Sequence, residues 1–299
     1  AGWSELLIMG FAGKDAMHTI IKLLLLLTVI SRAEAADIAV LSHKKMGSVT
    51  QLAQLLSEQL QQDVDVGLIT DDFPVDSYKA VVLAGPQAVS GWRGKQLAVA
   101  VFTSRKVVQQ YKSKLASAIF IEPPLTRQIR LATTILGDDK PFGILVADLT
   151  PWHQTVKAVK EIANVRWYAV SEYQNLNRAL VELLRNNEAL IGVYDPKLYS
   201  SANIKNILIT AYRQNKPLIG PSSAYIKAGA LATTYSDIPD VAKRLSEILQ
   251  QGLETGSWPE PDFNHYFNVR YNEQVGRSLN LLLPPEHKLQ EAISQQEAK

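Results

Sequence analysis

Residues 216–252 read KPLIGPSSAYIKAGALATTYSDIPDVAKRLSEILQQG, and their order of apolar, small and amphipathic segments indicates the fold. The apolar run at residues 217–219 is closed by a Gly-Pro pair, which is typical of a buried strand in a parallel sheet. A run of small residues begins at Ala228 and predicts a second strand, and apolar residues at helical spacing over 241–249 predict a helix that ends near Gly252. The stretch therefore predicts strand, loop, strand and helix, with a passage of the chain between two lobes.

The same alternation extends through the rest of the chain. Strands are predicted at residues 37–41, 64–69, 80–83, 97–102, 117–121, 142–146, 166–170, 189–194 and 263–269, and helices at 49–60, 106–115, 125–136, 154–163, 176–186 and 202–215. Strands and helices that alternate at these lengths favour parallel, doubly wound sheets. We therefore expect an α/β protein.

A chain of 299 residues is too long for one ordinary core, and the pattern divides into two lobes. We expect the chain to change lobe near residues 123–124, 235–239 and 256–261, which makes a hinge of three crossings. The predicted divisions are lobe I at 36–124 plus about 238–256, lobe II at 125–237 plus about 257–293, and a frayed polar tail at 294–299.

The composition of the chain narrows the range of expected functions. The net charge is +2, and no basic cluster interleaved with aromatic residues stands out, so nucleic acid is not an expected partner. Because the chain has no cysteine, disulfides, thiolate metal sites and a cysteine nucleophile are excluded. The five histidines are scattered, and no phosphate loop, zinc-binding H-E-x-x-H or G-x-S-x-G motif is present. We expect no cofactor, no metal and no enzymatic activity.

The first 35 residues read as a leader with a signal peptide. The apolar run at 20–30 is short for a membrane span, and Ala33 and Ala35 fit a small-x-small cleavage site before residue 36. Met17 is the better start for such a peptide. An uncleaved anchor or a buried first helix stays open as the alternative.

The serine-rich turn, the segment AGALAT, the helix ending in ILQQG and the segment FNVRYNEQVGRSLNLLLP follow one another in the last third of the chain. This order resembles the C-terminal half of ABC-transporter substrate-binding proteins with the type I periplasmic-binding fold, in particular the group that includes tryptophan and tyrosine binders. The resemblance is spread over about residues 37–293 and is densest after 142.

The resemblance implies a periplasmic protein that acts as a monomer. It would close two lobes about a hinge on a small organic solute, with an amino-acid-like one favoured, and deliver it to an ABC permease in the inner membrane. Two alternatives stay open. The same fold can report ligand occupancy to a membrane receptor or kinase, and a doubly wound enzyme with unrecognised catalytic residues is the other.

Short polar residues and glycines follow the predicted strands, where an α/β sheet places its ligand. The candidate ligand-binding residues are Ser42, Gly85, Gln87, Thr103, Ser104, Thr150, Trp152, Ser171, Tyr194, Asp195, Ser222 and Ser223. Their hydroxyls, together with free N–H groups at helix starts, can hold a carboxylate. Serine, threonine and aspartate also supply turn and cap bonds, so a purely structural role is the alternative for each.

Asp195 is the strongest single candidate. It follows the predicted strand at 189–194 and precedes Pro196. The resemblance implies that an aspartate at this strand end takes the ammonium group of the ligand, whereas a turn or helix-cap role is the alternative. Four aromatic residues could wall the ligand or pack in the core: Trp152, Tyr173, Tyr194 and Tyr199.

Overall fold

The computed structural model describes residues 37–298, apart from residues 71, 160 and 161 and the side chains of residues 154, 157 and 158. The predicted signal peptide, with its start at Met17 and its cleavage site after Ala35, lies outside the described residues. Within the described part of the chain, no helix is both long and apolar enough to cross a bilayer.

The first of two six-stranded sheets has the order β11-β5-β4-β3-β1-β2, and every neighbouring pair is parallel. Its strands are β1 (Ile38–Ser42), β2 (Val64–Leu68), β3 (Ala80–Ala84), β4 (Ala98–Thr103), β5 (Leu115–Phe120) and β11 (Asp262–Phe263). Its helices and 3₁₀ turns are α2 (Gly47–Leu60), η1 (Val75–Ser77), α3 (Pro86–Gly91), α4 (Arg105–Gln110), η2 (Lys112–Lys114) and α10 (Ile238–Thr255).

The second sheet has the order β12-β10-β9-β8-β6-β7, and only β12 is antiparallel to its neighbour. Its strands are β6 (Phe142–Val146), β7 (Val165–Ala169), β8 (Ala189–Ile191), β9 (Leu218–Ile219), β10 (Ala232–Tyr235) and β12 (Asn268–Tyr271). The accompanying helices and turns are α5 (Leu125–Leu136), η3 (Thr150–Trp152), α6 (His153–Val159), η4 (Val170–Glu172), α7 (Leu176–Asn186), α8 (Ser201–Arg213), α9 (Ala224–Ala228), α11 (Glu273–Ser278) and α12 (Glu286–Glu297).

Both sheets share one strand order. Numbered along each lobe, the first five strands lie in the order 2-1-3-4-5, as β2-β1-β3-β4-β5 and as β7-β6-β8-β9-β10. The connections therefore leave in opposite directions at β1/β3 and at β6/β8, which are the topological switch points where such sheets bind ligands. The predicted fold class, two doubly wound parallel-sheet lobes, is confirmed.

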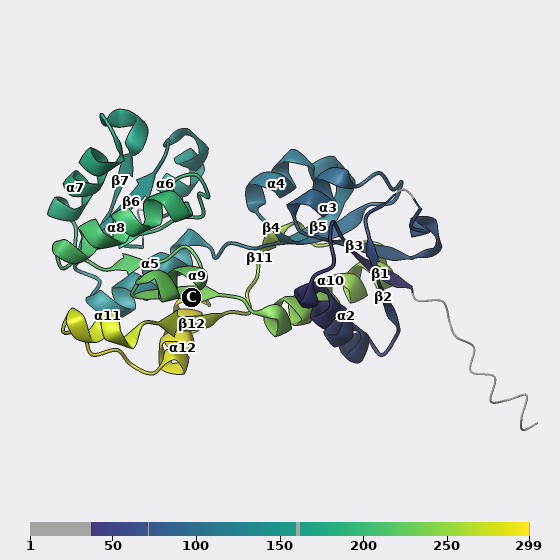
Figure 1. Ribbon diagram of the computed structural model, residues 1–299. Coiled ribbons are helices and arrows are strands. Elements are labelled where there is room, and N and C mark those ends of the chain that lie inside the picture. The colour runs from purple at the N-terminus through teal and green to yellow at the C-terminus, as the bar shows by residue number, and fades with distance from the viewer. Residues whose placement is uncertain (1–36, 71, 160–161, 299) are drawn as a thin grey trace, which may run out of the picture. The chain divides into compact units, whose positions relative to one another are not determined.

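The strand β1 shows why its sequence gives a parallel sheet covered on both faces. All five of its residues are buried. Ile38 and Val40 belong to one apolar cluster with α2 and α10, and Ala39 and Leu41 belong to another with α3. Because neighbouring residues of a strand point to opposite faces, a continuous apolar run needs helices on both sides. Figure 1 shows α2 and α10 side by side, in agreement with their many contacts.

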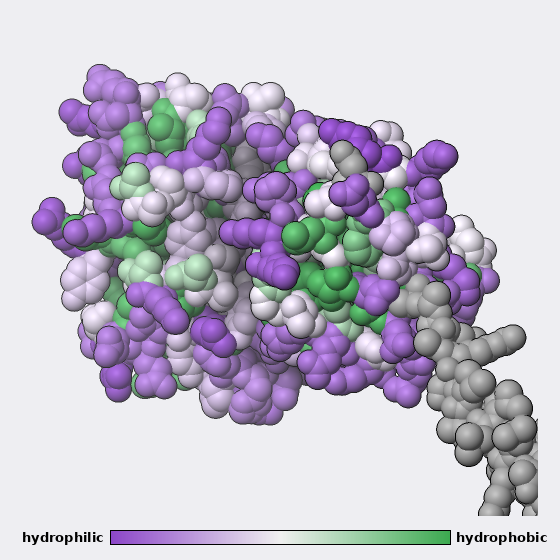
Figure 2. Space-filling model, turned by 45° about the vertical axis from the view of Figure 1, so that its right-hand side comes forward, coloured by the Kyte–Doolittle hydropathy of each residue, from purple (hydrophilic) through white to green (hydrophobic). Residues whose placement is uncertain are grey.

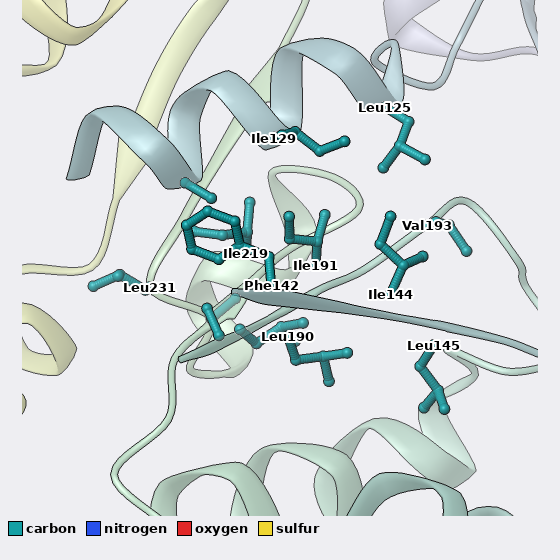
Figure 3. Close-up of a cluster of buried hydrophobic side chains, with 14 of the residues drawn as sticks. Leu125, Ile129, Phe142, Ile144, Leu145, Leu190, Ile191, Val193, Ile219 and Leu231 are labelled. Atoms are coloured by element: carbon teal, nitrogen blue, oxygen red, sulfur yellow. The ribbon is translucent and has the colours of Figure 1, made fainter. Parts of the chain in front are cut away.

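The second sheet has an equivalent core around β6. On α5, Leu125 and Ile129 point toward the sheet, where Phe142, Ile144 and Ile191 lie beneath them (Figure 3). The α5 residues recur at helical spacing, and the strand residues form short apolar runs. This packing fixes the start of α5, directly after the first crossing, on the second sheet.

The chain passes between the sheets three times, at residues 121–124, 236–237 and 264–267. The sequence analysis expects the first two crossings near residues 123–124 and 235–239. The third lies later than the predicted 256–261, because Asp262 and Phe263 pair with β5 of the first sheet. The single strand predicted at 263–269 is therefore two short strands in different sheets.

The C-terminal segment also differs from its prediction. Residues 294–297, expected to fray, form the last turn of α12. Leu289 and Ile293 are buried, and Arg127 of α5 binds the carboxylate of Glu297. A helix with two buried apolar residues among polar ones offers a weak periodic signal, so the sequence pattern did not indicate it.

The exposed surface is mostly polar. Figure 2 shows hydrophilic residues over most of the visible face, with apolar residues gathered in several separate groups. The large apolar residues that are exposed come from many different parts of the chain, and Leu97, Ile121 and Tyr212 are examples. This scatter is ordinary for a folded protein and marks no particular docking surface.

Candidate functional site

Ser42 and Gly85 lie at the switch point of the first sheet, at the ends of β1 and β3. The Ser42 hydroxyl is buried and donates to the carbonyl of Lys44 at 2.8 Å. Gly85 has φ of 97°, a conformation that strains any residue with a side chain, and it is the N-cap of α3. Gln87 is exposed in the first turn of α3. The structure therefore brings these three candidates to one edge.

Thr103 ends β4, the next strand along that edge, and Ser104 follows it. The Thr103 hydroxyl is buried and has no hydrogen-bond partner among the described residues. Phe102, just before it, has φ of 54°, and the register with β5 shifts there. A strained residue beside a shifted register re-aims the following side chain. Ser104 caps α4 by accepting the N–H of Val107 at 3.4 Å, so its role in the structure is the cap.

In the second lobe, Thr150 and Trp152 follow β6 in the turn η3. Thr150 is exposed, and its N–H donates to a carboxylate oxygen of Asp148 at 2.7 Å. Trp152 packs beside Trp167 with ring centroids 5.8 Å apart. Ser171 is exposed after β7, the outermost strand, so it lies farther from the switch point.

Asp195 lies four residues beyond the end of β8, because that strand stops at Ile191. Its Oδ1 accepts the N–H groups of Lys197 at 3.0 Å and Leu198 at 3.2 Å. This is the turn role that the sequence analysis left open, and Oδ2 accepts no hydrogen bond from the described residues. The preceding Tyr194 is 38% exposed at the same edge.

The other aromatic candidates divide between core and surface. Tyr199 is 2% exposed, its hydroxyl donates to the carbonyl of Leu145 at 3.1 Å, and burial raises its pKa far above the usual value. It is therefore a core residue rather than a wall for a ligand. Tyr173 is partly buried after β7, packed against the same core.

Ser222 and Ser223 follow β9 and are both partly buried. Pro221 before them lies so close to Gly192 after β8 that an added Cβ at Gly192 would come within 2.8 Å of the proline ring. The two loops are thus packed together, and this packing holds the serines beside the segment that carries Tyr194 and Asp195.

Glu122 is a residue that the sequence analysis missed. It lies two residues past β5, on the first crossing, and its Oε1 accepts the N–H of Arg105 at 2.9 Å. Its Oε2 is buried and has no hydrogen-bond partner in the described structure. Burial raises the pKa of the Glu122 carboxyl, and nearby N–H groups and the charge of Arg105 counteract only part of the rise. The sequence signal that could have indicated Glu122 is its position as a polar residue shortly after a predicted strand.

A small cavity of about 10 Å³ lies where the crossings meet, and we call it the crossing cavity. Each crossing contributes to its lining, with Glu122 from the first, Ser236 from the second and Asn264 from the third. The Asn264 Oδ1 accepts the N–H of Tyr266 at 3.0 Å, whereas its buried Nδ2 finds no acceptor among the described residues. One cavity is thus lined by a residue with a free acceptor and a residue with a free donor.

Arg127 also lines the crossing cavity, and each nitrogen of its guanidinium donates a hydrogen bond. It bonds both carboxylate oxygens of Glu297 at 2.9–3.1 Å, donates to the Asn264 carbonyl at 2.9 Å and lies 4.0 Å from the Phe267 ring centre. Since Arg127 already has these partners, it does not neutralise Glu122.

A larger hollow of about 530 Å³ lies between the outer edge of β12 and the start of α12. Two of its polar side chains bind neighbouring residues: Glu286 accepts the N–H of Tyr271 at 3.0 Å, and Asn268 donates to Asp240 at 2.7 Å. Across the residues that the structure describes, no cluster of His, Asp and Glu side chains is placed to hold a metal ion.

No protein-family model matches this chain, and no curated protein matches it either. Several solved structures are similar to it. The ligand-free, open structure of a substrate binding protein with adhesive properties from Clostridium difficile is 15% identical, with a TM-score of 0.63 over 84% of this chain and 97% of its own. A conserved domain protein from Vibrio cholerae is 13% identical, with a TM-score of 0.54 over 87% of this chain and 98% of its own.

An ABC domain from Streptococcus pneumonia in complex with L-Trp is 14% identical, with a TM-score of 0.53 over 86% of this chain and 98% of its own. At such identities the likeness concerns the fold. The chain therefore has the two-lobed α/β fold that these substrate-binding and ABC proteins share, along nearly their whole length.

Proposed function

We propose that this protein is the solute-binding component of an ABC importer. It holds a small organic solute, with an amino-acid-like one favoured, between its two lobes, and delivers it to a permease in the inner membrane. It acts in the periplasm as a monomer, and no covalent bond is made or broken.

One observation carries this proposal. Two sheets of the same strand order each present polar residues at a switch point, and three short crossings are the connections between them. A ligand that touches both edges favours the closed state, because only that state makes both sets of contacts. The solved structures of the same fold support this reading, since they include a substrate binding protein and a complex with L-Trp.

The proposed ligand site comprises the strand-end candidates of both lobes. In the first lobe, the buried Thr103 hydroxyl is the group best placed to gain from a ligand, because it has no partner within the described residues. In the second lobe, Ser222 and Ser223 lie in the loop packed against the Tyr194 segment. Asp195 contacts the ligand at the edge of the site through its Oδ2, because its Oδ1 accepts the N–H groups of its own turn.

A thermal-shift screen of the full chain tests the proposal. The panel contains amino acids, short peptides, small organic anions and sugars. A ligand that binds only the folded state stabilises it by RT ln(1 + [L]/Kd), about 2.7 kcal/mol at a concentration of 100 Kd. We expect a clear rise in melting temperature with one chemical class. No rise with any compound would contradict a solute-binding role and favour a protein partner in place of a solute.

A further inference from the structure

We infer that the solute carries an ammonium group and that Glu122 in the crossing cavity, rather than Asp195, receives it. This inference rests on the proposed function and names the chemistry of its ligand. It concerns a residue on the first crossing, outside the strand-end candidates.

The first reason is the unfilled oxygen of Glu122. Its Oε2 is buried and accepts no hydrogen bond, and the ion pairs of the described residues do not include it. The following residues cannot help, because Pro123 and Pro124 have no N–H to donate. A buried carboxylate without a cation or a full set of donors is costly, so a cationic donor supplied by a ligand would be strongly favoured there.

The second reason is the size of the cavity. A cavity of about 10 Å³ accommodates one water-sized group, and an ammonium group is of that size. Because the cavity holds one such group, only the ammonium group of an α-amino acid would enter it, and the rest of the solute would lie outside.

The third reason is the place of the cavity. Its lining includes Glu122, Ser236 and Asn264, one residue from each passage between the sheets. A ligand group seated here touches all three crossings, so its binding energy acts on the part of the chain that must bend during closure. Asp195 lies on a loop of the second lobe and does not line this cavity.

An ordered water is the competing occupant. It could accept from Asn264 and donate to Glu122, and the ligand would then bind without a charge at this point. The two occupants differ in their demand on the ligand, because only direct binding requires an ammonium group.

Titration calorimetry on the full chain distinguishes them. The probes are matched pairs with and without the amino group: L-tryptophan and indole-3-propionate, L-tyrosine and 3-(4-hydroxyphenyl)propionate, L-leucine and 4-methylpentanoate. Putrescine and ribose complete the set, as an amine without a carboxylate and a solute without an amine. Each probe is titrated into wild type, Glu122→Gln and Asp195→Asn. Glu122→Gln keeps an acceptor for the N–H of Arg105, and Asp195→Asn keeps the turn acceptor.

We expect at least one amine to bind wild type and its deaminated partner to bind at least tenfold more weakly. Glu122→Gln should weaken the binding of that amine at least tenfold. Asp195→Asn should change its affinity less than threefold. If Glu122→Gln and wild type bind the amine with equal affinity, the inference is overturned and the proposed function stands. The same holds if wild type binds only ribose or only a deaminated acid. A tenfold loss in Asp195→Asn with none in Glu122→Gln assigns the ammonium to Asp195. Binding of nothing by wild type removes the proposed function itself.

Discussion

Two carboxylates in the loops after β5 and β8, Glu122 and Asp195, look alike in sequence and differ in structure. Asp195 lies two and three residues before the N–H groups that its Oδ1 accepts, which is the geometry of an aspartate turn. Glu122 is followed by two prolines, so no local N–H reaches its free oxygen. The difference teaches that a strand-end carboxylate is available to a ligand only when its own loop leaves it unsatisfied.

The largest expected effect concerns Arg127, a buried charge with several hydrogen-bond partners. Arg127→Leu should lower the free energy of unfolding by about 3 kcal/mol, because it leaves Glu297 and the Asn264 carbonyl without their donor in a partly buried site. Urea unfolding measures the loss.

The matched control is Arg277→Leu, which breaks an exposed pair with Glu273 and should cost less than about 0.5 kcal/mol. A loss below about 1 kcal/mol for Arg127→Leu would show that the pairing of Arg127 contributes little to the stability of the protein. It would also weaken the contrast with Glu122.

The next effect concerns the satisfied carboxylate. Asp195→Ala should destabilise the ligand-free protein by about 1 kcal/mol, because two N–H groups lose their acceptor. Asp195→Asn keeps an acceptor oxygen and should cost clearly less. If the two variants unfold at the same urea concentration, the turn bonds contribute nothing measurable, and Asp195 is as free for a ligand as Glu122.

The unsatisfied carboxylate should respond with the opposite sign. Glu122→Gln removes an unpaired buried charge, so the ligand-free variant should be more stable than wild type at pH 7 by about 1 kcal/mol. Thermal and urea unfolding of the same samples provide the comparison. Destabilisation by a similar amount would mean that the charge is well solvated or paired in the folded state.

The smallest effect is the pH dependence of that difference. Burial raises the pKa of folded Glu122 above its ordinary value of 4.5, so on a rise in pH the unfolded chain releases its proton first. Wild type therefore loses stability relative to Glu122→Gln as the pH rises from about 4.5 through the raised folded value, and the difference is constant at lower and at higher pH. Urea unfolding at a series of pH values measures it, and a difference independent of pH would contradict the raised pKa.

Much of the fold could be predicted because its signals are local. Continuous apolar runs such as 38–41 mark strands buried on both faces, and Leu52 and Leu56 recur at helical spacing on α2. The third crossing was misplaced because two residues, Asp262 and Phe263, pair with a strand far away in sequence. The helix α12 was missed because its stability comes from packing and from the Arg127 pair, not from its own pattern.

The sequence could place the candidate residues after strands, but it could not give the hydrogen bonds of their polar atoms. The strand-end rule predicts which loops lie at the sheet edges. It does not tell which polar atoms are already used, such as the Ser42 hydroxyl on Lys44. Glu122 went unnoticed because its two prolines read as the end of a strand, although the same prolines are the reason that its oxygen is unsatisfied.

The central claim is that one solute engages both lobes and closes them about the three crossings. Small-angle X-ray scattering of the full chain, with and without the tightest-binding amino acid of the panel, measures this directly. We expect the radius of gyration to fall at saturating ligand for wild type, and Glu122→Gln at the same ligand concentration to keep the larger, ligand-free value. An unchanged radius of gyration for saturated wild type would contradict the account.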